Sequence, residues 1–70
     1  MRVIINGESE TIDEKDLSIS RLLAIKKVES PDMVSVQLNG KIVARQQYDQ
    51  QLLAENDEIE FLYFMGGGGA

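Results

Sequence analysis

The dipeptide Asn-Gly occurs twice in this chain of 70 residues, at positions 6–7 and 39–40, each time directly after a strand-like run. Asn and Gly both tolerate the positive φ of a type I′ turn, so this dipeptide is the strongest short signal for a β-hairpin. We therefore predict two hairpins. The first joins residues 2–5 to 8–12, and the second joins residues 33–38 to 41–43.

A short helix is predicted between the hairpins, after a polar loop over residues 13–16. Ser18 can cap its first turn. The apolar positions that follow fall on one helical face: Ile19, Leu22 and Leu23. We place Lys26 and Lys27 in the last turn, where cations complement the helix dipole. Residues 29–32 should end the helix, because they include a proline that cannot continue it.

Residues 58–65 are the most strand-like segment of the chain, and no neighbour in sequence remains to pair with them. An irregular connection over 44–55 precedes them, and we expect Tyr48, Leu52 and Leu53 to anchor it to the core. Pairing beside the first strand, parallel to it, would place the last strand in the middle of a mixed sheet. This order predicts an α+β fold, the β-grasp (ubiquitin-like) roll, with about five strands packed on one helix.

Strand alternation assigns the last strand's side chains to two faces. We expect Ile59, Phe61 and Tyr63 to face the helix, which leaves Leu62 and Phe64 on the open face. An exposed apolar pair at this place suggests a docking patch for a partner. The alternative is that the connection 44–55 covers it. The cations Lys41 and Arg45 are candidates for steering or pairing with carboxylates of a partner. The alternative is that they are ordinary surface residues.

The chain contains neither cysteine nor histidine. This excludes disulfides and thiolate nucleophiles, makes a zinc site improbable, and removes the usual general base near neutral pH. We therefore expect no enzyme activity, no metal and no bound cofactor. The acidic loop with Asp13, Glu14 and Asp16 lacks the spacing of a calcium loop, so we interpret it as a solvated loop.

The formal net charge of −5 argues against nucleic acid and anionic membranes as partners. It suits a partner protein with a basic face, or it merely keeps a small protein in solution. The first residues form a strand rather than a signal peptide, and no segment approaches the length of a membrane span. We expect a cytoplasmic protein that is monomeric when free.

The last five residues, Gly66-Gly67-Gly68-Gly69-Ala70, divide the chain into a domain over 1–65 and a tail over 66–70. Glycine loses the most entropy on ordering and has no side chain to bury, so we expect a flexible tail. Such a narrow tail can enter an enzyme's cleft where a Cβ does not fit. By itself it is more typical of a frayed terminus or a cloning linker.

Several segments agree in order and spacing with one known family: residues 3–7, the helix with Leu22 and Leu23, residues 36–43, Arg45, Tyr48, Leu53, residues 57–60 and the closing glycines. On these segments nearly the whole chain resembles the ThiS family, the sulfur carriers of thiamine biosynthesis. Each segment alone is weak evidence, whereas their order, ending in glycines, is specific.

The resemblance implies chemistry done on the tail rather than by the domain. In such carriers an E1-like adenylating enzyme uses ATP to adenylate the terminal glycine. Sulfur from a cysteine desulfurase system then displaces AMP, and the resulting thiocarboxylate serves thiazole synthase. The resemblance places the reactive tail at Gly67, Gly68 and Gly69. We expect the partner to dock beside this tail, at Leu62 and Phe64 of the open face and at Met65 and Gly66.

The ThiS family normally ends in Gly-Gly, whereas this chain ends in Gly69-Ala70. The family register puts the terminal pair at Gly67-Gly68, and removal of Ala70 alone would put it at Gly68-Gly69. We predict trimming by a peptidase before activation, since the Cβ of Ala70 should obstruct a cleft shaped for glycine. Some sulfur carriers of methionine or cysteine synthesis resemble this pattern and are released by a metallopeptidase, so one of those pathways is an alternative to thiamine.

Other functions stay open at this point. Within the carrier class, the chain is also similar to small subunits of molybdopterin synthase, which tend to be longer. From other classes, a β-grasp interaction module with an inert tail and a protein modifier joined to lysines both fit the sequence.

Overall fold

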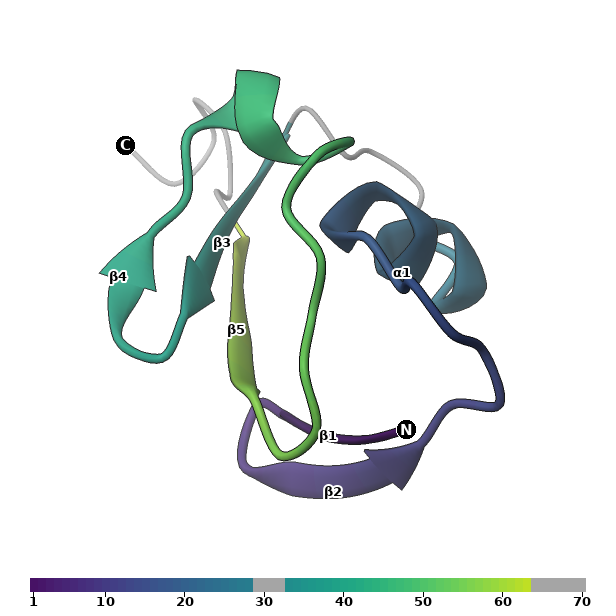
Figure 1. The fold of residues 1–70 in the computed structure, drawn as a ribbon. Helices are drawn as coiled ribbons and strands as arrows, with labels where there is room; N and C mark the ends of the chain where they lie inside the picture. The colour runs from purple at the N-terminus through teal and green to yellow at the C-terminus, as the bar shows by residue number, and fades with distance from the viewer. Residues whose placement is uncertain (29–32, 64–70) are drawn as a thin grey trace.

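A computed structural model describes residues 1–28 and 33–63 of the chain (Figure 1). Its elements are β1 (Arg2–Ile5), β2 (Glu8–Thr11), α1 (Ile19–Ile25), β3 (Val34–Leu38), β4 (Lys41–Ile42), the 3₁₀ helix η2 (Arg45–Gln47) and β5 (Glu58–Tyr63). The strands form a single sheet in the order β2-β1-β5-β3-β4, and α1 packs on one face of it. The predicted β-grasp roll is therefore confirmed.

Both predicted hairpin turns have the expected backbone. Asn6 and Asn39 have φ values of +51° and +52°, and Gly7 and Gly40 both have φ of +86°. Two successive residues with positive φ are what a type I′ turn requires. The strands are slightly shorter than predicted, because β2 ends at Thr11 and β4 contains only two residues.

The last strand lies in the middle of the sheet, as predicted. β5 runs parallel to β1 through the pairs Ile4↔Glu58 and Ile5↔Ile59. On its other side it runs antiparallel to β3 from Leu38↔Ile59 to Val34↔Tyr63. The final strand thus joins the two hairpins into one sheet.

The two turn asparagines also bind β5 through their side chains. The Asn6 Oδ1 accepts a hydrogen bond from the Phe61 amide at 2.9 Å. The Asn39 Oδ1 accepts one from the Glu58 amide at 2.9 Å, and its Nδ2 donates to the Asp57 carboxylate at 3.1 Å. Each hairpin turn is therefore tied directly to the central strand.

The core lies between the sheet and α1. Its fully buried side chains are Val3, Leu17, Ile19, Leu22, Val34, Val36 and Ile59. The connection 44–55 reaches this core at Tyr48 and Leu53, both buried as predicted. The Tyr48 hydroxyl accepts a hydrogen bond from the Val36 amide at 3.1 Å.

The predicted anchoring by Leu52 is wrong, since its side chain is 49% exposed. Leu52 forms an isolated antiparallel bridge with Ser18, and the Leu53 amide donates to the Leu17 carbonyl at 2.7 Å. Successive side chains of extended backbone point to opposite sides. Burial of Leu53 therefore turns Leu52 outward.

The start of α1 is confirmed, because the Ser18 hydroxyl accepts a hydrogen bond from the Arg21 amide at 3.0 Å. The prediction for its end is wrong. The helix ends at Ile25, Lys26 is its C-cap and Lys27 has φ of +57°. The lysines thus lie beyond the last turn. The predicted terminator at 29–32 lies outside the described residues, and α1 ends before it.

The Asn39 side chain provides a test of the turn's link to β5. Asn39→Ala should lower the free energy of unfolding by about 1–3 kcal/mol, because it removes the hydrogen bonds and places alanine at a positive φ. Asn39→Gly keeps access to that φ and should lose only the hydrogen-bond part, about 1 kcal/mol. Urea unfolding measures both changes. Lys41→Ala, at an exposed neighbouring position, is the control. Stability of Asn39→Ala equal to that of the unchanged chain would contradict this role.

Candidate functional site

The described end of β5 is the base of the predicted reactive tail. The tail glycines Gly67, Gly68 and Gly69 lie outside the described residues, as do the predicted docking residues Phe64, Met65 and Gly66. Leu62 is the predicted docking residue that the structure describes. We call Leu62 and Tyr63, together with their β3 partners Ser35 and Val34, the tail root.

Leu62 lies on the face of the sheet opposite α1. It is 39% exposed and stands across from Ser35. Ile42, which is 62% exposed, stands across from Gln37 on the same face, because directly paired residues share a face. The connection 44–55 therefore does not cover Leu62. An apolar surface next to the tail is available to a partner.

Tyr63 departs from the sequence prediction. Ile59 and Phe61 are buried against the core as expected, but Tyr63 is 58% exposed. The alternation of β5 directs Tyr63 to the helix side. However, α1 ends at Ile25, and the part of the chain that the structure describes leaves this position of the helix-side face open. The tail root thus exposes an aromatic ring on one face and an apolar side chain on the other.

Arg45 is the predicted cation that the fold brings to the tail root. Its Nη2 donates to the Val34 carbonyl at 3.4 Å, and Val34 pairs with Tyr63. Lys41 pairs with Leu38 at the opposite end of β3. Nothing in the sequence distinguishes the two cations, whereas the register of β3 against β5 shows that Arg45 contacts the residue paired with Tyr63.

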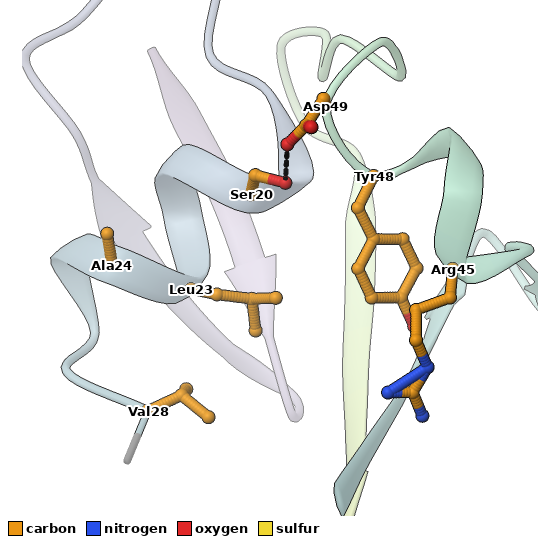
Figure 2. A pocket seen from close by; sticks show the side chains of 7 residues that line it. All are labelled: Ser20, Leu23, Ala24, Val28, Arg45, Tyr48 and Asp49. Atoms are coloured by element: carbon orange, nitrogen blue, oxygen red, sulfur yellow. Dashed lines mark hydrogen bonds between the residues drawn. The ribbon is translucent and has the colours of Figure 1, made fainter. Parts of the chain in front are cut away.

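A depression of about 410 Å³ lies between α1 and η2 (Figure 2). Leu23, Ala24 and Val28 line one wall, and the Tyr48 ring lines the other. At its rim the Ser20 hydroxyl donates to the Asp49 carboxylate. This hydrogen bond holds the segment after η2 against the helix. We therefore interpret the depression as part of the packing between α1 and the connection 44–55.

Neither a metal cluster nor a membrane-spanning helix is present in the part of the chain that the structure describes. Residues 1–28 and 33–63 contain no group of three or more carboxylate, imidazole or thiol side chains that could hold a metal ion. None of their helices is long and apolar enough to cross a membrane.

The acidic loop before α1 is tied to the helix by one ion pair. The Arg21 guanidinium donates to both Glu14 carboxylate oxygens, with its Nη2 2.7 Å from Oε2. This hydrogen bonding, together with the charge of Arg21, lowers the pKa of Glu14 below its ordinary value. The neighbouring Asp13 and Asp16 are exposed, in agreement with a solvated loop.

The fold and the tail root define a ubiquitin-like β-grasp domain whose central strand β5 precedes the glycine run in the sequence. The profile of the ThiS family matches residues 2–68. The chain therefore belongs to the ThiS family of small sulfur carrier proteins, as the sequence segments predicted.

Two solved structures from Geobacter metallireducens are similar to this chain. The crystal structure of its thiamine biosynthesis protein ThiS is 39% identical, with a TM-score of 0.86 over 97% of this chain and 100% of that one. The solution structure of a thiamine biosynthesis protein from this organism is also 39% identical, with a TM-score of 0.79 over 97% and 88%.

A curated relative differs from these in length. The thiazole synthase of Magnetococcus marinus is 31% identical over 68 residues, which cover 97% of this chain. The chain spans 20% of the length of that protein.

The Glu14–Arg21 pair predicts a change in one titration. Because the pKa of Glu14 is lowered in the folded state, the pair stabilises that state at pH values above 4.5, the ordinary pKa of the group. This contribution is lost as the pH falls through the pKa of Glu14 in the folded state. Arg21→Gln should return the pKa of Glu14 towards 4.5. NMR titration of the Glu14 side-chain carboxyl measures this shift, with Arg2→Gln as the control. An unchanged Glu14 pKa in Arg21→Gln would contradict the pairing. Because the pair is exposed, we expect little effect on overall stability.

Proposed function

We propose that this chain is a sulfur carrier of thiamine biosynthesis whose C-terminal glycine becomes a thiocarboxylate. The family match carries this proposal, because it runs through the whole β-grasp domain and continues into the glycine run as far as Gly68. A match that ended with the β-grasp domain would support the fold equally well, but it would not include the glycines on which the proposed chemistry depends.

The proposed chemistry takes place at the tail carboxylate in three steps. A carboxylate is a poor electrophile, so an E1-like enzyme first joins it to AMP from ATP, releasing pyrophosphate. A persulfide sulfur supplied by a cysteine desulfurase system then attacks the acyl carbon, and AMP leaves. Cleavage of the resulting acyl disulfide by a thiol leaves the thiocarboxylate. The domain contributes binding surface and position, while ATP and the catalytic groups belong to the partners.

In this proposal the folded domain is the part that a partner binds, and the tail is the part that reacts. β5 is hydrogen-bonded to β1 and β3, and the Asn6 side chain binds the Phe61 amide close to its end. A partner that binds the domain therefore meets Tyr63, the last described residue of β5, at a defined position. This matters because adenylation requires the carboxylate to lie accurately against ATP.

Thiazole synthase is the proposed sulfur acceptor. In the relative from Magnetococcus marinus, a segment similar to this chain forms part of a single polypeptide named thiazole synthase. A carrier and its acceptor joined in one chain would meet at high effective concentration. We propose that the separate chain described here meets its acceptor by docking instead.

We propose that the chain is trimmed to Gly68 before activation. The family profile ends at Gly68, which leaves Gly69 and Ala70 beyond it. This favours Gly67-Gly68 as the working terminal pair, with a peptidase removing the last two residues.

Intact mass spectrometry tests the carrier function and the trimming together. The full chain is incubated with the E1-like enzyme, ATP and a persulfide source, with and without a host extract. We expect a species that ends at Gly68 and has one oxygen replaced by sulfur, formed only when the extract is present. A variant that ends at Gly68 should need no extract.

Two results would contradict parts of this proposal. A thiocarboxylate formed on Ala70 of the intact chain would exclude the need for trimming. An unmodified mass for both the full chain and the variant ending at Gly68 would exclude the carrier function and favour an interaction module with an inert tail.

Docking at the open face gives a separate prediction. Leu62→Glu should slow thiocarboxylate formation at least about tenfold, because it places a charge in an apolar contact area. Leu62 is exposed, so the urea unfolding midpoint should change little. Thr11→Glu, exposed on the edge strand β2, is the matched control. Equal rates for Leu62→Glu and the control would contradict docking at this face.

A further inference from the structure

A second depression, of about 320 Å³, lies on the helix side of the sheet beside the tail root. Ile5, Phe61 and Tyr63 line it with apolar surface. Its remaining lining comes from Asn6, Glu8, Glu10 and Lys26. Tyr63 belongs by alternation to the same stripe as the buried Ile59 and Phe61, yet it is exposed. This depression is therefore the part of the helix-side face that α1 leaves uncovered.

The charged side chains of the depression are fixed by the register of the first hairpin. Glu8 pairs with Ile5 and Glu10 pairs with Val3, and both apolar partners are buried on the helix side. Because directly paired residues share a face, Glu8 and Glu10 also point to that side. The turn at Asn6 and Gly7 thus places two carboxylates next to an exposed tyrosine ring.

Lys26 neutralises only one of these carboxylates. Its Nζ lies 2.7 and 2.8 Å from the two Glu10 oxygens. Glu8 is exposed and makes no ion pair with any residue in 1–28 or 33–63. The depression therefore carries one carboxylate in excess, on a chain whose formal net charge is already −5.

We propose that this depression binds a lysine or arginine side chain of a partner protein that handles the tail. The apolar stem of such a side chain can lie along the exposed Tyr63 ring, above the nearly buried side chains of Ile5 and Phe61. Its charged head can lie over the Tyr63 ring and pair with Glu8. A neutral or acidic side chain would leave Glu8 without a partner in a closed interface, which is unfavourable.

The inference rests on the proposed function only for the identity of the partner. It adds to the open-face docking of Leu62 a second contact on the other face of the same strand. Because Leu62 and Tyr63 are consecutive, a partner using both would hold β5 from its two sides at the start of the tail. Complementary charge would also speed its association and make that rate depend on salt.

The first test uses a small probe and needs no partner. N-acetyl-arginine amide is titrated into the full ¹⁵N-labelled chain, with N-acetyl-citrulline amide as the uncharged control of nearly equal shape. We expect the arginine probe to shift the amide signals of Glu8, Phe61 and Tyr63, and the citrulline probe to shift them much less. Equal shifts with both probes would overturn the proposal.

The second test uses the E1-like enzyme as the probe. Glu8→Gln should weaken its binding to the carrier about threefold at low salt, and Tyr63→Ala about fivefold. Tyr63→Phe keeps the ring and should bind as the unchanged chain does. Asp13→Asn also removes one negative charge, in an exposed loop, and should have no effect. Urea unfolding midpoints check that all four variants remain folded.

The outcomes separate this inference from the proposed function. Unchanged affinity in Glu8→Gln and Tyr63→Ala, with normal thiocarboxylate formation, would overturn the depression's role and leave the carrier function intact. An unchanged chain that never forms a thiocarboxylate would overturn the carrier function, and the arginine probe would then still test the depression. Shifts seen in a chain ending at Tyr63 but absent from the full chain would assign the depression to the chain's own tail, against the proposal.

Discussion

The pairing of β5 between β1 and β3 is the constraint on which the rest of the structure depends. The two hairpins are local structures, and each has its own Asn-Gly turn. They become one sheet only when the last strand enters between them, with Ile59 fully buried at its centre. Loop closure between distant segments costs entropy before these contacts form. The side-chain amide oxygens of the turn asparagines offset part of that cost, since Asn6 and Asn39 both accept hydrogen bonds from β5 backbone amides.

This pairing also bears on the proposed carrier function, in which partner enzymes act on the tail. The strand held on both sides is the one that leads into the glycine tail. Its alternation puts Leu62 on the open face and Tyr63 on the helix side. A partner can therefore recognise two chemically different surfaces at the described end of β5.

Local signals predicted most of the fold. The Asn-Gly turns, the Ser18 cap and the position of β5 all depend on short patterns or on the shortage of other pairing partners, and each is confirmed. The predictions that failed concern which side chains are buried or brought together, and short sequence patterns do not determine this. Leu52 and Leu53 are equally apolar, and only the bridge from Ser18 decides which one is buried. The exposure of Tyr63 depends on how far the described part of the chain covers the helix-side face, and the position of Arg45 follows from the β3–β5 register. The predicted tail residues lie beyond the described part of the chain, so the reactive site stays a prediction.

The central claim is that the folded domain, and not the tail sequence alone, makes the terminal glycine a substrate. The most direct measurement compares the rate of thiocarboxylate formation by the E1-like enzyme on the chain ending at Gly68 and on a synthetic peptide of residues 58–68. We predict that the folded chain reacts and that the peptide, at the same concentration, does not react measurably. Equal rates for the peptide and the chain would show that the tail suffices, and would contradict a role for the β-grasp domain in presenting it.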